Sequence, residues 1–185
     1  MNKICGNKPS LCEVHIFGDG NIVSFGNTNK HFKAKIYVGW NDCPAHNVKI
    51  NIGDNCLCNG MEIFAFDNDS TVTIGNDCLF GENIYIWASD THTVIDSEGN
   101  ICNIGKNVNI GNHVWIGKNA TVLKNTTIAD NSIVGTMSCV HGSFNEVGSV
   151  IVGNPAKCVK TGYTWDVRRP NRWMRDNNVS GVKNI

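Results

Sequence analysis

A repeat of six residues runs from Ile104 to Val140 and constrains the fold of the chain more than any other feature. Large aliphatic residues recur at every sixth position, and small or β-branched residues recur four positions after each of them. The first set is Ile104, Ile110, Ile116, Val122, Ile128, Val134 and Val140, and the second is Val108, Val114, Ala120, Thr126, Ser132 and Ser138. A helix would spread such positions around its surface, whereas short strands separated by corners keep every sixth side chain inside. The pattern therefore predicts a β-solenoid.

Three faces of six residues would close one triangular coil, and successive coils would stack their strands at the parallel spacing of about 4.8 Å. One coil cannot bury its own inner face, so stability has to come from stacking. The same step is visible earlier in the chain, at Ile52, Cys58, Phe64, Ile74, Phe80 and Ile86. Between Phe64 and Ile74 the interval is ten residues, so four residues near 67–70 are expected to bulge out.

The segment from Ile86 to Ile104 has the length of one coil but lacks the repeat. As part of a wall it would place Asp90 inside the core, so residues 88–103 are predicted to leave the wall as a loop. Loops on a rigid scaffold are frequent positions for binding and catalytic residues.

The 185 residues are expected to form a single domain. Its expected parts are irregular N-terminal coils (1–47), the solenoid (48–153) with its loop, and a short C-terminal tail (154–185) in which Pro170 should interrupt any helix. The formal net charge of +0 gives no reason to expect nucleic acid or an anionic membrane as partner. Because no apolar stretch has the length of a signal peptide or a membrane helix, a cytoplasmic location is expected.

The nine cysteines are an odd number with irregular spacing, which is not typical of a disulfide framework or of zinc knuckles. Cys56 and Cys78 stand four residues after aliphatic members of the repeat. We interpret them as compact apolar core residues.

The loop contains the sharpest catalytic candidate, His92 in Ser89-Asp90-Thr91-His92. Histidine is partly unprotonated at neutral pH, as proton abstraction from a hydroxyl requires. Asp90 would orient the ring or stabilise the imidazolium. A lone loop histidine is also a common solvated surface residue, so this segment alone does not establish catalysis.

Several motifs strengthen the case for catalysis. They occur in the order Thr71–Gly75, the His92 loop, Val114–Gly117, Ser132–Gly135 and Gly153–Lys157. In this order they resemble the hexapeptide-repeat O-acetyltransferases, whose coils are left-handed. The loop form Ser-Asp-x-His-x-x-x-Asp, ending at Asp96, is similar to that of enzymes acetylating capsule, lipopolysaccharide or sialic-acid sugars. Galactoside and maltose acetyltransferases share the other motifs.

The resemblance implies an all-β, left-handed parallel β-helix and an acetyl-CoA-dependent O-acyltransferase acting on a carbohydrate hydroxyl. It implies that His92 is the catalytic base, supported by Asp90, and that a backbone N–H holds the developing oxyanion. Trp115 would line the active site or pack against a neighbouring subunit, and both interpretations remain open. Asp69 and Trp87 would contact the acceptor, although a turn Asp is equally typical of a solvated position.

The resemblance also implies positions for coenzyme A, late in the repeat and in grooves between the subunits of a homotrimer. These positions are Gly117, Lys118, Thr136, His141, Gly142, Lys157 and Lys160. Of these, Lys157 and Lys160 would meet phosphates as point charges. No metal is expected.

Three alternatives stay open. The first is an N-acetyltransferase acting on an amino or nucleotide sugar. The second is a zinc hydratase of the gamma-carbonic-anhydrase type, which needs three histidines, although His92, His113 and His141 lack the close pair found in that family. The third is a non-catalytic or sugar-binding solenoid, which would need neither His92 nor the Gly153–Lys157 motif.

Overall fold

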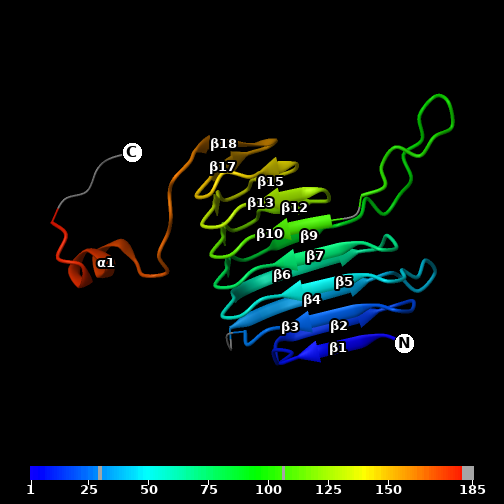
Figure 1. Cartoon of the computed structure of the whole chain (residues 1–185), viewed down its shortest axis with the longest axis horizontal. Coiled ribbons are helices and arrows are strands. Elements are labelled where there is room, and N and C mark those ends of the chain that lie inside the picture. Colours follow the sequence, from blue (N-terminus) through cyan, green and yellow to red (C-terminus); the bar gives the residue numbers. More distant parts are fainter. Residues whose placement is uncertain (29–30, 106, 181–185) are drawn as a thin grey trace.

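The computed structural model of the chain describes residues 1–28, 31–105 and 107–180. Coils of strands are stacked along one axis, a long loop leaves the stack on one side, and the C-terminal segment leaves it on the other (Figure 1). Residues 29–30 of the expected N-terminal coils and 181–185 of the expected tail lie outside the described residues.

Short strands build the coils, and one helix follows them within the described residues. In chain order the elements are β1 (Lys3–Gly6), β2 (Cys12–Ile16), β3 (Ile22–Phe25), β4 (Phe32–Val38), β5 (Lys49–Ile52), β6 (Leu57–Ala65), β7 (Thr71–Ile74), β8 (Leu79–Phe80), β9 (Ile84–Trp87), β10 (Asn107–Ile110), β11 (Trp115–Ile116), β12 (Thr121–Leu123), β13 (Thr126–Ile128), β14 (Ile133–Val134), β15 (Cys139–Val140), β16 (Ser143–Phe144), β17 (Val150–Gly153), β18 (Ala156–Lys160) and α1 (Pro170–Asp176).

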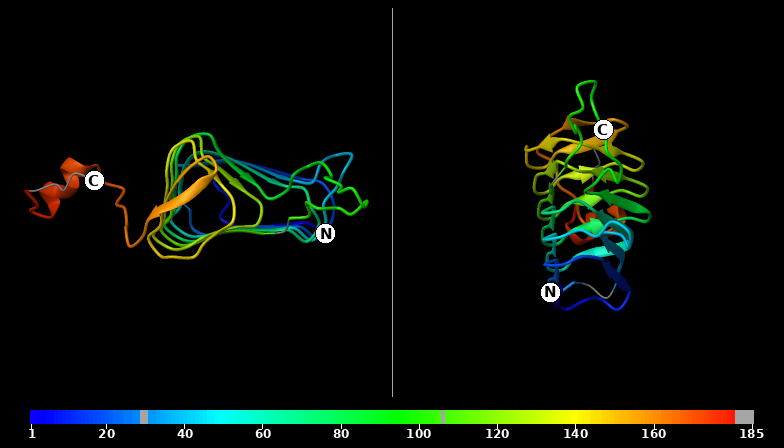
Figure 2. Two further views of the ribbon diagram at one scale, coloured as in Figure 1. Left: turned by 90° about the horizontal axis from the view of Figure 1, so that it is seen from above. Right: turned by 90° about the vertical axis from the view of Figure 1, so that its right-hand side faces the viewer.

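The strands form three walls of a prism with a rounded triangular cross-section (Figure 2). The first wall contains β1, β3, β5, β7, β10, β13 and β16. The second contains β8, β11, β14 and β17, and the third contains β2, β4, β6, β9, β12 and β15. The second and third walls belong to one sheet because β6 bends and pairs first with β8 and then with β9.

From β7 onward the chain visits the three walls in turn, which defines three corners. The first corner comprises residues 75–78, 111–114, 129–132 and 145–149, and residues 53–56 lie at the same corner on the preceding coil. The second corner comprises residues 81–83, 117–120 and 135–138. The third corner comprises residues 66–70, 88–105, 124–125 and 141–142.

Between Ile104 and Val140 the inward positions follow the predicted six-residue step with one exception. The buried members are Ile110, Ile116, Val122, Ile128, Val134 and Val140. The small positions are buried as well, at Val108, Val114, Ala120, Thr126, Ser132 and Ser138. The prediction for Ile104 is wrong: its side chain is 64 % exposed, because it lies on the returning limb of the loop before β10 begins.

Cys56 and Cys78 are buried and free, which confirms their interpretation as compact core residues. Each thiol points to a backbone carbonyl on the neighbouring coil. The Sγ of Cys56 lies 3.2 Å from the oxygen of Gly75, and that of Cys78 lies 3.2 Å from the oxygen of Gly111.

The N-terminal coils pair regularly although their lengths vary. In the first wall Lys3 pairs with Ile22, Ile22 with Lys49, Lys49 with Thr71, and Val108 with Thr126. The corresponding coil lengths are 19, 27, 22 and 18 residues. The early coils are therefore irregular in length but carry the same parallel ladder as the repeat.

β6 reverses the expected orientation of Phe64. The inward side chains are Met61 and Ile63, both buried. Phe64 instead projects outward between Tyr37 and Trp87, with ring centroids 5.3 and 4.1 Å apart. The six-residue step fails here because β6 has nine residues, and a shift of one residue moves a side chain to the other face of the sheet.

The first corner is held by a ladder of hydrogen bonds from one coil to the next. The N–H of Asp54 donates to Oδ1 of Asn76 (2.8 Å), that of Asn76 to Oδ1 of Asn112 (2.9 Å), and that of Asn112 to Oδ1 of Asp130 (2.7 Å). Each short polar side chain thereby satisfies a corner N–H that the wall strands leave without a partner.

The C-terminal segment closes the stack and then runs back along it. β18 pairs antiparallel with β17, and Trp165 stacks on the ring of His113 at 4.4 Å while its Nε1 donates to the carbonyl of His113 (2.7 Å). The expectation that Pro170 interrupts any helix is wrong. Pro170 is the first residue of α1, where the N–H that proline lacks would have no helical partner. No helix of the described residues is long and apolar enough to cross a membrane.

The burial of the six-residue positions predicts different losses in the free energy of unfolding for two similar substitutions. Ile116→Ala should lower the free energy of unfolding by about 2–5 kcal/mol, because it leaves a cavity between coils. Ile104→Ala should change it by less than about 0.5 kcal/mol, because the side chain is exposed. Denaturant unfolding followed by circular dichroism measures both, and equal losses would contradict the assignment of Ile104 to the loop.

Candidate active site

A network of polar contacts anchors the base of the loop at the third corner. Nζ of Lys124 lies 2.6 Å from Oδ2 of Asp90, and Nδ2 of Asn103 donates to the same oxygen (2.9 Å). The same Asn103 amide donates to the carbonyl of His92 (2.7 Å), and the N–H of His92 donates to the carbonyl of Asp90 (2.8 Å). Lys124 also donates to the carbonyl of Asn103. The main chain on both sides of His92 is therefore fixed to the solenoid.

The contacts around Asp90 favour the ionised form of its carboxyl group. Its partial burial opposes ionisation, but hydrogen bonds from Lys124 and Asn103 and the charges of Lys124 and His141 outweigh it and lower the pKa of the carboxyl. The side chain of Lys124 is only 13 % exposed, so this pair is shielded more than an ordinary surface ion pair. Among the described residues no hydrogen bond joins the carboxylate of Asp90 to the ring of His92.

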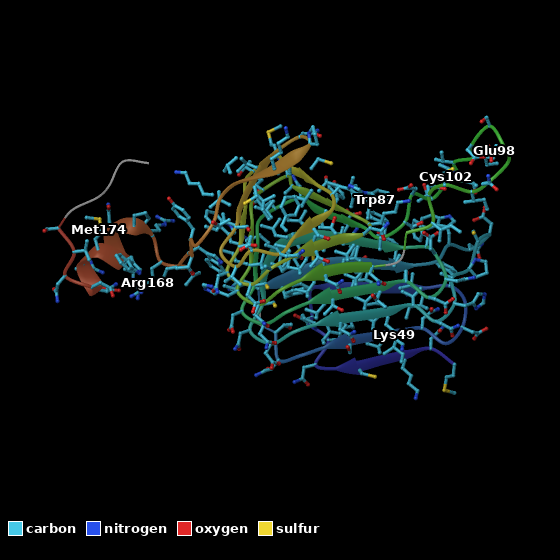
Figure 3. All side chains as sticks on the ribbon, turned by 45° about the horizontal axis from the view of Figure 1, so that its top comes forward. Lys49, Trp87, Glu98, Cys102, Arg168 and Met174 are labelled. Carbon is cyan, nitrogen blue, oxygen red and sulfur yellow. The ribbon has the colours of Figure 1, made fainter. Side chains whose placement is uncertain are left out.

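The outer part of the loop is a small hairpin that projects from the solenoid, and Figure 3 shows Glu98 at its far end. Ile95 and Ile101 form an antiparallel bridge. Oδ1 of Asp96 accepts from the N–H groups of Glu98 (2.9 Å) and Asn100 (2.8 Å). Asp96, the last member of the loop motif, thus shapes the hairpin turn.

The structure brings four of the predicted site residues to the third corner or beside it. Trp87 ends β9 immediately before the loop, and His141 and Gly142 lie at the same corner after β15. Asp69 lies at this corner on the preceding coil, with a positive φ of 60°, and accepts a hydrogen bond from Nδ2 of Asn47 (3.2 Å). The expected acceptor residues and the His92 loop therefore share one edge of the prism.

Gly117, Lys118 and Thr136 lie at the second corner, away from His92 across the width of the third wall. A Cβ on Gly117 would stand 2.7 Å from the backbone nitrogen of Thr136, so the close approach of two coils requires glycine here. Lys118 forms an ion pair with Glu82 at 2.6 Å.

Trp115 lies on the second wall, and the loop with His92 leaves the third wall. The indole is 40 % exposed and lies 6.2 Å from the ring of Trp165 in the C-terminal segment. Under this segment is a cavity of about 380 Å³ lined by Asn55, Leu57, Asp77, Cys78, His113, Trp165, Asp166 and Val167. Within one chain Trp115 and His92 are not brought together.

Lys157 and Lys160 lie on β18 at the end of the stack. Lys157 is exposed, and Nζ of Lys160 lies 5.5 Å from the ring centroid of Tyr163. Within the described parts of the chain no group of three or more His, Cys, Asp or Glu side chains is placed to hold a metal ion.

Lys124 and Asn103 are site residues that sequence reasoning missed. Register is the signal that could have identified Lys124, since Leu123 pairs with Trp87 and the next residue therefore faces the start of the loop. Asn103 has no such signal, because its partner depends on the path of an irregular segment.

A family description, bacterial transferase hexapeptide (six repeats), matches residues 107–142. Among curated proteins nothing matches the chain. Among solved structures, the polysialic-acid-specific acetyltransferase NeuO is 25% identical with a TM-score of 0.81, over 95% of this chain and 79% of that one. The polysialic acid O-acetyltransferase OatWY is also 25% identical, with a TM-score of 0.66, over 95% and 92%.

An N-acyltransferase from Bacillus cereus, AntD, solved with dTDP and coenzyme A, shares the fold at 15% identity, with a TM-score of 0.60 over 95% of this chain and 89% of that one. The chain is thus a left-handed parallel β-helix of the hexapeptide-repeat type, as the resemblance implies. Its resemblance to hexapeptide-repeat O-acetyltransferases and its class, an acyltransferase, are confirmed.

The anchor of the loop predicts a dependence on pH. Because the pKa of Asp90 is lowered in the folded chain, the anchor is intact above the ordinary pKa of aspartate, about 3.9, and is lost only as pH falls through the lowered value. Amide exchange protection of His92 and Val94, whose N–H donates to Asn103, should therefore fall in acid. Asp90→Asn should lower it at neutral pH too, whereas Asp69→Asn should leave it unchanged. Equal protection in the chain and in Asp90→Asn would contradict the anchor.

Proposed function

We propose that the chain transfers an acetyl group from acetyl-CoA to a hydroxyl of a carbohydrate acceptor, such as capsular polysaccharide, sialic acid or lipopolysaccharide. The observation that carries the proposal is the anchored position of His92 at a corner of a solenoid similar to NeuO and OatWY. The donor is supported by the coenzyme A held in the AntD structure, which has the same fold. With acetyl-CoA as donor, a cytoplasmic location is the corresponding proposal.

In the proposed reaction the ring of His92 takes the proton of the acceptor hydroxyl as its oxygen attacks the thioester carbon. The carbon–sulfur bond breaks, the acetyl group remains on the sugar oxygen, and the sulfur leaves as thiolate. The proton held by His92 then passes to that sulfur, so free coenzyme A is released and the histidine is again a base.

Asp90 acts in this proposal as a positioning residue. Its carboxylate is occupied by Lys124 and Asn103, so it fixes the loop main chain and does not orient the ring of His92 directly. The rigid main chain limits the positions that the ring can adopt, which favours a productive approach to the hydroxyl.

Coenzyme A would be held by the late coils. Lys157 and Lys160 supply charge for its phosphates. Thr136 and Lys118 present exposed side chains at the second corner. Gly117 would contribute its backbone, because glycine has no side chain.

A homotrimer is part of the proposal because one chain keeps these groups apart. The third wall separates the second corner from His92, and a second copy would bring its own second corner to the loop. The hairpin also leaves large apolar side chains without cover in one chain, at 55–64 % exposure. These are Val94, Ile95, Ile101 and Ile104.

Replacement of the base gives the main test of the proposed function. His92→Ala should lower turnover by about 10²–10⁴-fold, the usual contribution of a positioned base, while the melting temperature and the affinity for acetyl-CoA stay near those of the unchanged chain. The rise of activity as histidine loses its proton should disappear in the variant. Mass spectrometry of sugars incubated with acetyl-CoA measures the transfer. Near-normal turnover without His92, or transfer only to an amino group, would refute this proposal.

The assembly is tested by sedimentation equilibrium, which should give three times the chain mass of 20.2 kDa. Ile101→Glu should weaken the assembly, because a charge would be buried against the neighbouring copy. Activity should fall in proportion to the loss of trimer. A fully active monomer would contradict active sites between subunits.

A further inference from the structure

The C-terminal segment after β18 forms an arm that stands away from the solenoid. The arm comprises residues 161–180, and it leaves the stack on the side opposite to the His92 loop (Figure 1 and Figure 2). Its helix α1 has seven residues, and none of these is buried. A helix of this length is marginal in water unless it packs against another surface. The arm is therefore expected to have a partner outside its own chain.

The root of the arm is fixed to the solenoid, so the arm has a defined direction. Trp165 is stacked on His113 and lies 6.2 Å from the ring of Trp115. Arg168 then donates two parallel hydrogen bonds to Asp166, from Nε to Oδ1 (2.9 Å) and from Nη2 to Oδ2 (2.7 Å). Such a planar bidentate contact fixes geometry more closely than a single ion pair does. The arm therefore projects from the edge of the second wall as an ordered element.

The arm combines an excess of positive charge with exposed apolar side chains. Its charged residues are Asp166, Arg168, Arg169, Arg172, Arg175 and Asp176. Three of the arginines share the two carboxylates at 2.7–3.6 Å, whereas Arg169 has no acidic partner among the residues that the structure describes. The exposed apolar side chains of the arm are Tyr163, Val167, Trp173 and Val179. A partner of the arm should therefore be both acidic and apolar.

The hairpin of the His92 loop, residues 94–102, has this complementary character. It contains Asp96 and Glu98 but no lysine or arginine. In the described parts of the chain, the carboxylate of Glu98 has no cationic partner. The apolar side chains of the hairpin are each more than half exposed, and they are Val94, Ile95 and Ile101. The arm and the hairpin thus match in charge, and each has apolar surface that one chain leaves uncovered.

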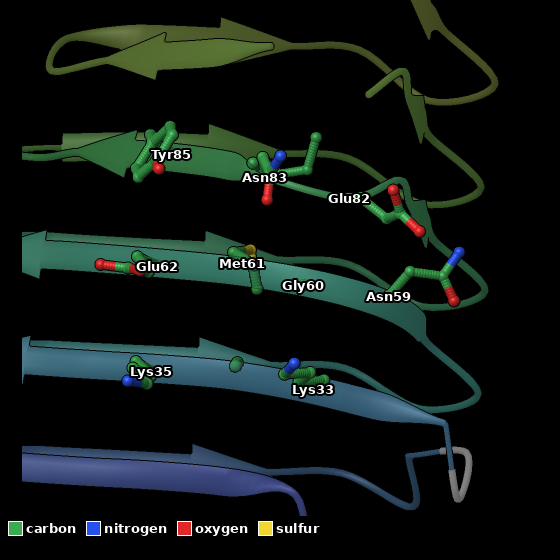
Figure 4. Close-up of a pocket in the computed structure, with 11 residues that line it drawn as sticks. Lys33, Lys35, Asn59, Gly60, Met61, Glu62, Glu82, Asn83 and Tyr85 are labelled. Atoms are coloured by element: carbon green, nitrogen blue, oxygen red, sulfur yellow. The ribbon is translucent and has the colours of Figure 1, made fainter. Parts of the chain in front are cut away.

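A hollow on the third wall is a poorer match for the hairpin. It has a volume of about 380 Å³, and its charged lining residues are Lys33, Lys35, Glu62 and Glu82 (Figure 4). Two lysines and two carboxylates balance each other, and Lys35 stands opposite Glu62 in the pairing of β4 with β6. This surface therefore has no preference for an acidic segment, whereas the arm has one.

We propose that the arm of one copy of the chain holds the hairpin of the next copy in the homotrimer. The inference rests on the proposed function, which includes the trimer, and it names the surfaces that meet. Because the arm and the loop leave opposite sides of one chain, they meet only between copies, in a head-to-tail contact that a closed ring repeats three times. The arginines of the arm face Asp96 and Glu98, and the apolar side chains of both segments cover each other.

This contact completes the candidate active site. The root of the arm lies beside Trp115, so a hairpin held by the arm lies over the second wall of the neighbouring copy. The base of that hairpin carries His92, which one chain alone keeps apart from Trp115. The arm is thus a positioning element: it fixes the loop from the neighbouring copy, while Lys124 and Asn103 fix it within its own chain.

A zero-length cross-link tests the contact directly. Arg169→Lys keeps the positive charge and provides an amine that a carbodiimide joins to a nearby carboxylate. A denaturing gel should show a band of twice the chain mass, and mass spectrometry of its digest should find the new amine joined to Asp96 or Glu98. Lys3, exposed at the N-terminal end of the stack, should form no link to the hairpin. Absence of the pair between arm and hairpin from the cross-linked protein would overturn the inference.

Charge reversal tests the physical basis of the contact. Arg169→Glu and Glu98→Lys each place like charges at three identical contacts, so each should raise the dissociation constant of the trimer by about tenfold at low salt. The double variant should recover most of this loss. Arg169 is the N-cap residue of α1, where an acidic side chain is favourable, so the loss would not come from melting of the helix.

Amide exchange reports on the hairpin even if other surfaces keep the trimer intact. The N–H of Asp96 donates to the carbonyl of Asn100, and that of Cys102 to the carbonyl of Val94. Both should lose protection in each single variant, because the hairpin is no longer covered. Lys3→Glu is the matched control, since it makes the same change of charge far from both surfaces, and it should behave as the unchanged chain.

The inference and the proposed function fail in different ways. Unchanged protection and unchanged dissociation in both single variants, or a double variant no better than either, would overturn the contact between arm and hairpin even if acetyl transfer is normal. A chain that sediments as a monomer would overturn it as well. Absence of transfer to any carbohydrate would contradict the proposed function instead, and the cross-link and exchange measurements would still decide the contact.

Discussion

The distance between neighbouring coils is the constraint on which the rest of the structure depends. Parallel strands must stand about 4.8 Å apart to share hydrogen bonds, and this spacing has to hold at the corners as well as in the walls. Glycine at position 117 and the polar ladder through Asn76 and Asn112 satisfy that demand in two ways. Glycine removes a side chain that would collide, and the amide side chains replace backbone partners that a turning chain cannot offer.

The fixed spacing between coils leaves the walls and corners little room for variation. The candidate functional groups therefore lie where the chain departs from regular stacking. The His92 loop leaves the stack at a corner, and its base is then tied back by Lys124 and Asn103. The bend of β6, which pairs first with β8 and then with β9, is the second departure from regular stacking. Both departures lie along the third wall, so a rigid and otherwise uniform prism presents one face with distinct chemical character.

The sequence predicted the repeat region well because each inward residue there depends only on its position in a regular coil. It failed where coil length changed: Phe64 turned outward when a strand gained residues, and Ile104 continued the step in sequence but left the wall in space. The catalytic candidate, His92, was identified through its motif. Its anchors were not, since the contact of Asn103 with Asp90 depends on the path of an irregular loop.

The antiparallel strand β18 has a consequence for how the protein behaves in concentrated solution. Stacked parallel strands repeat at the same spacing as the strands of amyloid fibrils, so an open end of such a stack is a template on which further chains can grow. β18 reverses direction over β17 and places Lys157 and Lys160 at the outer edge. Charged lysines on an edge strand disfavour the pairing of another strand. A single reversed strand thus disfavours the growth of a filament on the exposed edge of β17.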